Sequence, residues 1–226
     1  ALYFRGANLV MGIGEDADEE EGVRLLTQAY EKGELRAAVI LAECYYNGWG
    51  VSKDTKRTVA LLMKNPMPSS KKAQYLLGLC NYYGDGTDKN LDRAFFHFKA
   101  AASLGYGWAK DYLGDCYYNG QGTQVDYKEA ARWYKDAADN NGIGISAHSL
   151  AFMYLNGEGV PKSKEIALQY FLTAAKKGIV QAQKIVAEAY LTGDGFDESN
   201  EKAFYWMEKA AEQGDAEAQV TLGRYY

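Results

Sequence analysis

Three cysteines are the first candidates for redox or metal chemistry in this chain. They stand at Cys44, Cys80 and Cys116, at intervals of 36 residues. If this interval reflects a helical repeat, the three side chains occupy the same site on successive helices, which lie roughly 8–10 Å apart. That separation exceeds the roughly 7 Å Cα limit for a disulfide, and thiols spaced along one axis cannot converge on a metal ion. We therefore expect buried free thiols, with no metal site and no cofactor.

The two histidines are the next candidates, for proton transfer. His97 corresponds, at intervals of 36 or 37 residues, to Trp133, Tyr170 and Trp206, so we expect it to be a core or half-buried residue. His148 falls where it could contact a ligand, but a lone histidine without a placed partner does not catalyse. The sequence has no Ser-His-Asp set, nucleophile elbow, Walker loop or His-Glu-x-x-His motif. We predict no catalytic residue and no enzyme activity.

Six Gly-x-Gly elements could be read as phosphate-binding loops. Their first glycines are separated by 36, 36, 36, 37 and 36 residues and stand at Gly12, Gly48, Gly84, Gly120, Gly157 and Gly193. A phosphate loop follows a strand and opens one helix, whereas these elements recur throughout the chain. The Asp-rich turns at 85–88 and 194–197 lack the ligand spacing and final Glu of a calcium loop. The elements therefore indicate the turns of a tandem repeat.

Each repeat is predicted to contain two helices. An apolar stripe at helical spacing precedes each Gly-x-Gly and includes a tiny residue, which lets a second helix approach closely. Six residues after the first glycine stand N-cap residues, namely Asp18, Asp54, Asn90, Asp126, Ser163 and Ser199. Glu21 and Glu129 add the spacing of a capping box. The second helix should stop at a glycine, at Gly33, Gly105, Gly142, Gly178 and Gly214.

These motifs resemble the Sel-1-like repeat, a relative of the tetratricopeptide repeat. Two segments match well, Ala109 to Gly122 (AKDYLGDCYYNGQG) and Leu150 to Val160 (LAFMYLNGEGV). The resemblance covers essentially the whole chain. It implies an all-α fold, a right-handed α-α superhelical solenoid of about six repeats plus a partial seventh, whose first helices line a concave face. It also implies a role in assembling protein complexes.

We predict one solenoid domain over residues 1–226, because a helix pair cannot bury its apolar face without a stacked neighbour. The repeats are expected to start near positions 1, 37, 73, 109, 146, 182 and 218. The second helix after Asp54 should end near Lys64, since Pro66 cannot continue it, which leaves either a tolerated loop or a bend used by a partner. The extra residue of the 37-residue interval lies within 139–141 and should enlarge a surface turn.

The two ends of the chain fall inside repeats. Ala1 aligns with Ala37, and Tyr226 aligns with Tyr190. Solenoids usually close with polar capping helices, and none is visible, so we expect a fragment of a longer protein. Unpaired cysteines and the lack of an Asn-x-Ser/Thr sequon favour a reducing compartment such as the cytoplasm. A secretory or periplasmic location remains open.

Charge and hydropathy bear on two classes of partner. Lys and Arg number 25 against 30 Asp and Glu, which gives a formal net charge of −5. Binding to duplex nucleic acid needs clustered basic residues, so we predict no nucleic acid partner. No apolar run approaches the roughly 20 residues that span a bilayer, so we predict no membrane contact from this segment.

The faces of the first helices that repeat packing leaves unused are the candidate partner surface. They carry a ladder of aromatic and polar residues, namely Tyr46, Tyr75, Tyr82, Tyr83, Asp111, Asp115, Tyr118, Asn119, His148 and Phe152. Tyrosine combines a large apolar area with a polar tip and is favoured at interface hot spots. Two alternatives stay open: the tyrosines pack between neighbouring repeats, and the asparagines only form turns.

We therefore predict a non-catalytic scaffold or adaptor that binds a protein or peptide along its concave face. One alternative is a structural module that assembles into a homo-oligomer through open solenoid ends. Another is a regulatory domain of a larger enzyme.

Overall fold

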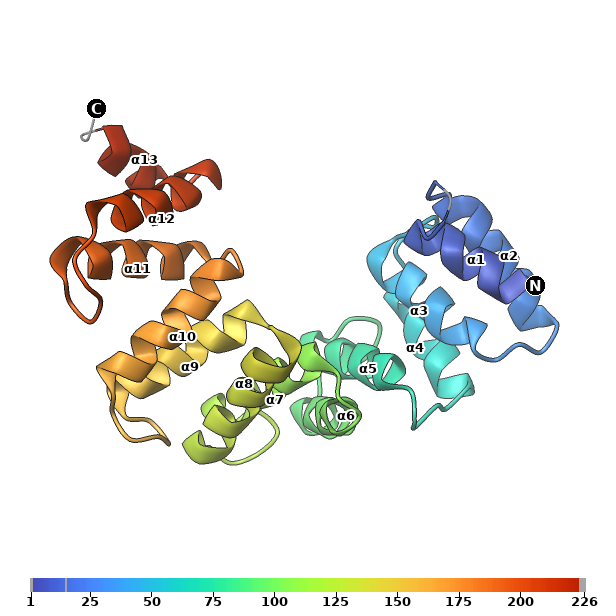
Figure 1. Cartoon of the computed structure of the whole chain (residues 1–226). Coiled ribbons are helices and arrows are strands. Elements are labelled where there is room, and N and C mark those ends of the chain that lie inside the picture. Colours follow the sequence, from blue (N-terminus) through green and yellow to red (C-terminus); the bar gives the residue numbers. More distant parts are fainter. Residues whose placement is uncertain (1, 15, 224–226) are drawn as a thin grey trace. The chain divides into compact units, whose positions relative to one another are not determined.

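The computed structural model describes residues 2–14 and 16–223. In these residues the chain forms helices and turns, without strands, arranged in two compact units, 1–106 and 107–226. The first unit contains α1 (Leu2–Met11), α2 (Glu19–Glu31), α3 (Ala37–Asn47), α4 (Thr55–Lys64), α5 (Lys71–Tyr83) and α6 (Leu91–Ser103). The second contains α7 (Gly107–Asn119), α8 (Tyr127–Asn141), α9 (Gly144–Asn156), α10 (Lys164–Lys176), α11 (Val180–Thr192), α12 (Asn200–Glu212) and α13 (Ala216–Gly223) (Figure 1). The predicted all-α class is confirmed; Ala1 and Tyr226 lie outside the described residues.

Helices pack in the order of the chain within each unit. In the first unit the contacts run from α1 through α6, each helix touching the next. In the second they run from α7 through α13 in the same way. A helix therefore packs both on its partner and on a helix of the neighbouring repeat, which is how helix-pair repeats bury their apolar faces.

The three cysteines are buried free thiols, as the sequence predicted. Cys44 and Cys80 belong to the first unit and Cys116 to the second. Burial raises the pKa of each thiol to about 12. The three side chains therefore stay protonated and serve as small apolar parts of the core.

The two glycines of a Gly-x-Gly element have different tasks. Gly157 is the left-handed C-cap of α9, with φ of 78°, and its N–H donates to the Met153 carbonyl at 2.8 Å. Gly159 lies against the preceding second helix, where an added Cβ would stand 2.2 Å from the main chain of Tyr127. Gly50 approaches the start of α2, and Gly86 approaches the start of α4, equally closely. Contact between repeats therefore accounts for the second glycine at positions 50, 86 and 159.

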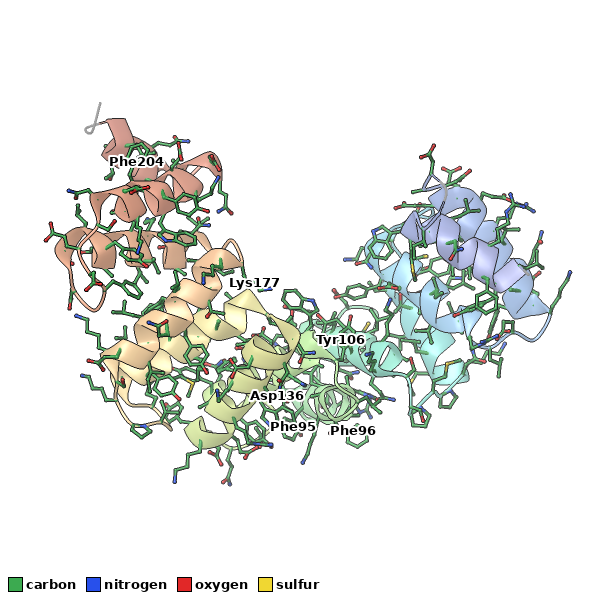
Figure 2. All side chains as sticks on the ribbon, viewed as in Figure 1. Phe95, Phe96, Tyr106, Asp136, Lys177 and Phe204 are labelled. Atoms are coloured by element: carbon green, nitrogen blue, oxygen red, sulfur yellow. The ribbon has the colours of Figure 1, made fainter. Side chains whose placement is uncertain are left out.

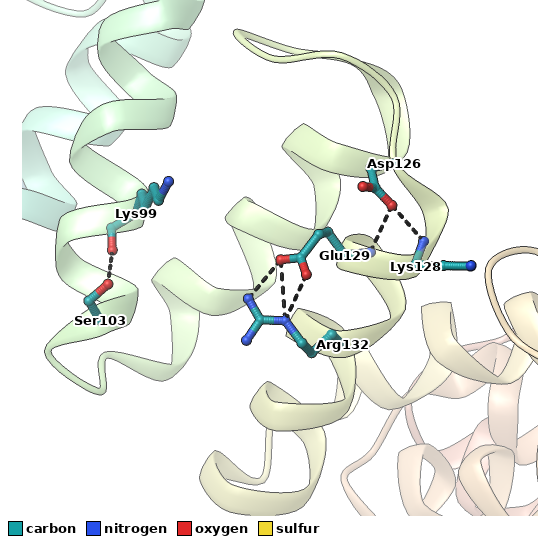
Figure 3. A network of polar contacts seen from close by, with 6 residues as sticks. All are labelled: Lys99, Ser103, Asp126, Lys128, Glu129 and Arg132. Atoms are coloured by element: carbon teal, nitrogen blue, oxygen red, sulfur yellow. Dashed lines mark hydrogen bonds and ion pairs between the residues drawn. The ribbon is translucent and has the colours of Figure 1, made fainter.

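All six predicted N-caps are observed. In each case the side-chain oxygen accepts a hydrogen bond from a main-chain N–H in the first turn of the following helix. Figure 3 shows Asp126, whose Oδ1 accepts from the main-chain N–H groups of Lys128 and Glu129 at 3.0 and 3.1 Å. Each cap fixes the start of a second helix and therefore the direction in which that helix leaves the turn.

The predicted capping boxes form only in part. The N–H groups of Glu21 and Glu129 donate to the side chains of Asp18 and Asp126, but the glutamate side chains do not bond back to the N–H groups of these N-cap residues. The main-chain N–H of Asp126 donates to the Tyr117 carbonyl at 2.9 Å, and that of Asp18 donates to the carbonyl of Leu9. Because the first helix already uses the donor that a capping box needs, Glu129 pairs with Arg132 instead, at 2.7 Å (Figure 3). Glu21 likewise pairs with its neighbour Arg24.

One irregular segment follows the prediction and the other does not. Helix α4 ends at Lys64, two residues before Pro66, as expected. The extra residue near 139–141 does not enlarge a turn. Helix α8 instead has 15 residues, against 13 in α10, and Gly142 caps it directly with φ of 67°. The last turn of α8 is held by the side-chain pairs Lys135–Asp139 and Asp136–Asn140, so the inserted residue extends the helix.

Candidate functional site

A cleft in the second unit brings together side chains from the first helices of two consecutive repeats. It has a volume of about 380 Å³ and opens between α7 and α9, with α8 behind it. The lining residues are Asp115, Tyr118, Asn119, Tyr134, His148, Ser149 and Phe152. Five of them were predicted from the sequence as partner-binding residues. The cleft is therefore the candidate binding site.

Two hydrogen bonds between repeats frame this cleft. At one end the Ser146 hydroxyl of α9 donates to Asp111 Oδ1 of α7 at 2.5 Å. At the other end the Tyr118 hydroxyl donates to Glu158 Oε2, in the turn after α9, at 3.0 Å. Both bonds tie the repeat of α7 to that of α9. The spacing of the two cleft walls is therefore set by the stacking of the repeats.

Asp115 supplies the carboxylate of the cleft. Its Oδ1 accepts a hydrogen bond from the hydroxyl of Tyr134 at 2.6 Å. Burial raises the pKa of Asp115, and this hydrogen bond opposes the rise. Tyr134 is only 2% exposed and lies with its ring against Gly114, where an added Cβ would stand 2.6 Å from the ring. The absence of a side chain at Gly114 thus lets Tyr134 reach and orient Asp115.

Asp111 lies behind the cleft. It is 7% exposed, and its Oδ1 accepts the hydrogen bond from the hydroxyl of Ser146. Burial raises its pKa to about 6, with a smaller contribution in the same direction from the charge of Asp115. Although Asp111 shares a helix face with Asp115, its position gives it a structural part in joining α7 to α9.

His148 and Phe152 form the aromatic wall on α9. Their rings meet edge to face with centroids 5.0 Å apart, and both rest on the buried ring of Phe171, at 5.8 and 5.1 Å. The Nε2 atom of His148 is buried and has no hydrogen-bond partner among the described residues. Burial lowers the pKa of His148, so its imidazole is neutral at pH 7. Phe152 remains 40% exposed.

Tyr118 and Asn119 form the opposite rim on α7. The ring of Tyr118 packs edge to face on Tyr127 at 5.2 Å, which fixes its orientation together with the bond to Glu158. Asn119 is exposed, and its Nδ2 donates to the main-chain oxygen of Asp115 at 3.1 Å. This rim therefore offers an aromatic face and an amide held in place. Asn47 makes the equivalent local bond to the Glu43 carbonyl at 3.1 Å, so the alternative interpretation of Asn119 as a turn-forming residue stays open.

The four predicted tyrosines of the first unit have other surroundings. Tyr46 packs against a buried cluster that includes Leu62 and Leu77, and burial raises its pKa to about 12. Tyr75 contacts the ring of Tyr106 at 4.7 Å.

Tyr82 in this unit meets two rings and one cation. Its ring lies 5.0 Å from that of Tyr83 and 6.0 Å from that of Phe98, and the Lys89 ammonium stands over it at 5.9 Å. Tyr83, in contrast, is 54% exposed. Tyr46, Tyr75 and Tyr82 thus take part in packing, as the alternative interpretation of the ladder proposed.

Sequence reasoning missed two residues of the cleft, Tyr134 and Ser149. Tyr134 follows its Gly-x-Gly by the same interval as the buried Phe98 and Phe171. The other repeats have Leu26, Leu62, Phe98, Phe171 and Met207 at this position. A hydroxyl at a position that is otherwise apolar needs a polar partner when buried, and this exception was the available signal. Ser149 offers no comparable pattern.

A metal site, a catalytic histidine and a membrane span are the other candidate features in the part of the chain that the structure describes. It has no group of three or more His, Cys, Asp or Glu side chains that could hold a metal ion. His97 is half-buried, as predicted, and its Nδ1 lies 2.8 Å from Gln74 Oε1. No described helix combines the length and the apolar composition needed to cross a bilayer.

Stacked helix pairs with Gly-x-Gly turns and a cleft between first helices define a helix-pair repeat protein. The chain belongs to the Sel1 repeat family, whose repeat matches residues 1–34, 35–62, 71–106, 109–142, 144–179 and 180–215. Sel1 repeats generally serve as protein–protein interaction modules, and proteins built from them are typically non-catalytic scaffolds.

Solved structures with similar folds include other proteins of this family. One is c5321, a protective antigen present in uropathogenic Escherichia coli strains, with 28% identity, a TM-score of 0.85, and coverage of 99% of this chain and 48% of that chain. The present chain thus spans about half the length of that protein. A Sel1 repeat protein from Oxalobacter formigenes has 28% identity, a TM-score of 0.80, and coverage of 96% and 84%.

The immunity protein Pa5087 from Pseudomonas aeruginosa is a more distant structural relative. It has 19% identity and a TM-score of 0.53, with coverage of 93% of this chain and 80% of that chain. At this identity the likeness concerns the fold alone. Comparison with curated protein sequences finds no match.

Proposed function

We propose that this chain is a non-catalytic binding module that holds a peptide or a protein segment in the cleft between α7 and α9. The observation that carries the proposal is the convergence of five predicted residues, from two successive repeats, on one cleft: Asp115, Tyr118, Asn119, His148 and Phe152. The general role of Sel1 repeats in protein–protein interaction supports the same conclusion.

The chemistry of the lining supports binding rather than catalysis. Phe152 and Tyr118 offer aromatic surface, the kind of side chain that dominates interface hot spots. Ser149 and His148 both line the cleft, but no hydrogen bond joins them. A nucleophile needs a base within hydrogen-bond reach. The net charge of −5 favours a protein partner over a nucleic acid.

A peptide selection tests the proposal. Peptides are selected from a random displayed library on the full chain, and their affinity is measured by titration calorimetry for wild type, Phe152→Ala and Phe96→Ala. Phe96 is the matched control, because it is 66% exposed on α6 (Figure 2) and belongs to the other unit. Loss of the Phe152 ring should weaken binding by about 1–3 kcal/mol, whereas loss of the Phe96 ring should not.

Two results would count against this function. Either the library yields no binder, or the selected peptides bind the folded Phe152→Ala protein as tightly as wild type. Circular dichroism of both variants shows whether they are folded. Self-assembly through open ends and service as a regulatory domain stay predictions of the sequence.

A further inference from the structure

Resting on the proposed function, we propose that the cleft between α7 and α9 selects a segment carrying a lysine or arginine side chain, with Asp115 as the counter-charge. The carboxylate of Asp115 has no cationic partner among the described residues. Asp115 makes one side-chain hydrogen bond, from the neutral hydroxyl of Tyr134 to Oδ1, and none of the described ion pairs includes it. Its second oxygen, Oδ2, accepts no hydrogen bond from the described residues.

Three of the basic residues nearest in sequence pair with other carboxylates, and a fourth, Lys128 at the start of α8, is exposed and does not line the cleft. Lys110, the one basic residue of α7, pairs with Asp136 on α8 at 2.9 Å and donates to Asn141 at 2.8 Å (Figure 2 labels Asp136). On α8, Arg132 pairs with Glu129, and Lys135 pairs with Asp139. Helix α9 contains no lysine or arginine, and neither residue type lines the cleft.

A second carboxylate strengthens the negative field at this place. Asp111 lies one helical turn before Asp115 and also has a neutral donor, Ser146, as its partner. The imidazole among the described lining residues, that of His148, is neutral at pH 7 because burial lowers its pKa. The cleft thus presents negative charge without an internal cation, so an incoming anion meets repulsion.

The other residues that line the cleft suit both the aliphatic part and the charged group of a basic side chain. Tyr118 and Phe152 stand on opposite rims, and aromatic faces attract ammonium and guanidinium groups. Asn119 and Ser149 add side-chain oxygens that can accept from a guanidinium or ammonium.

An apolar side chain in the same place would leave the Asp115 carboxylate covered and unpaired, which is costly. A cationic side chain removes that cost and gains a charge-assisted hydrogen bond. The chemistry therefore favours lysine or arginine over an apolar or acidic residue.

Amino-acid probes that differ in charge provide the test. The isotopically labelled full chain is titrated at neutral pH with Nα-acetyl-arginine methylamide, and amide shifts of α7 and α9 are followed by NMR. The neutral analogue Nα-acetyl-citrulline methylamide and the acidic Nα-acetyl-glutamate methylamide serve as comparisons. We expect saturable shifts at residues 115–119 and 148–152 with the arginine probe, and affinity weaker by about tenfold or more with citrulline.

Two carboxylate variants separate the charge from the fold. Asp115→Asn keeps an oxygen that can accept from Tyr134, so we expect it to fold and to bind arginine no better than citrulline. Asp194→Asn removes an exposed carboxylate of the same unit that is paired with Lys164, and it should bind arginine as wild type does.

Three results overturn the inference: no saturable shift with arginine, equal affinity for citrulline, or preference for the acidic probe. Its failure is distinguishable from that of the proposed function. Selected peptides that depend on Phe152 but need no basic residue would leave the binding function intact and remove the cation preference. Loss of both peptide capture and arginine binding would remove both.

Discussion

Asp111 and Asp115 lie one turn apart on α7, yet their carboxylates meet different surroundings. Asp111 is covered by the repeat that follows and bonds to Ser146, whereas Asp115 lines the cleft and is oriented by Tyr134. The same residue type at i and i+4 therefore serves the joint between repeats in one case and the candidate site in the other. Burial, rather than spacing, makes the difference.

Asp111→Asn tests the part played at the joint. Burial raises the pKa of Asp111 from 3.8 to about 6, so the folded chain holds this proton more tightly than the unfolded chain. The contribution of the side chain to stability is then largest at low pH and is lost as the pH rises from about 4 to about 6. The asparagine variant lacks this titration. Its free energy of unfolding relative to wild type should therefore increase between pH 4 and pH 8, by up to about 3 kcal/mol.

Urea unfolding of both proteins across that pH range measures the difference. Ser146→Ala, which removes the hydroxyl donor, should raise the pKa of Asp111 further and steepen the dependence. A constant difference between wild type and Asp111→Asn at all pH values would mean that Asp111 is not a buried carboxylate.

At the scale of the elements, turns and caps were predictable because their determinants are local. The glycine ends and the six N-caps recur at fixed offsets and depend only on the residue in place. The reciprocal half of each capping box is missing because the competing acceptors, the carbonyls of Leu9 and Tyr117, come from the preceding helix. The inserted residue near 139–141 also behaved differently, since side-chain pairs in α8 stabilise a helix of 15 residues, against 13 in α10.

Alanine variants of two glycines test whether the second glycine of a Gly-x-Gly element is needed for contact between repeats. Gly159 and Gly178 both have positive φ, 68° and 86°, but only Gly159 approaches a neighbouring main chain. Gly178→Ala should cost about 1 kcal/mol, the price of placing a side chain in the left-handed region. Gly159→Ala should cost about 3 kcal/mol or more, because its Cβ would also overlap Tyr127.

Thermal and urea unfolding of the two alanine variants distinguish these costs. Equal destabilisation would show that the second glycine is needed for its backbone conformation alone, and the explanation from contact between repeats would then fail.

At the scale of the whole molecule, the repeat explains how a binding site can be predicted without a catalytic motif. Asp115 and Phe152 hold the same register position in consecutive repeats, as do Tyr118 and Leu155. Stacking places such positions on neighbouring first helices, so their proximity follows from the period. The period does not reveal that Asp111 is buried or that Tyr134 reaches the cleft, since both depend on contacts between helices.

The spacing of the repeats does not specify which side chain of a partner the cleft would bind. The sequence predicted a protein or peptide ligand, and membership of the Sel1 repeat family supports that general role. The proposed preference for a basic side chain rests on the carboxylate of Asp115, which has no cationic partner among the described ion pairs, and on the ion pair of Lys110 with Asp136.

Hydrogen exchange on a peptide complex tests the central claim most directly. With a selected peptide at saturation, we predict slower amide exchange at residues 115–119 and 148–152, and unchanged exchange in α12 and α13. Protection confined to α12 and α13 or to the first unit, with no change at the two cleft segments, would contradict the assignment of the binding site to the cleft between α7 and α9.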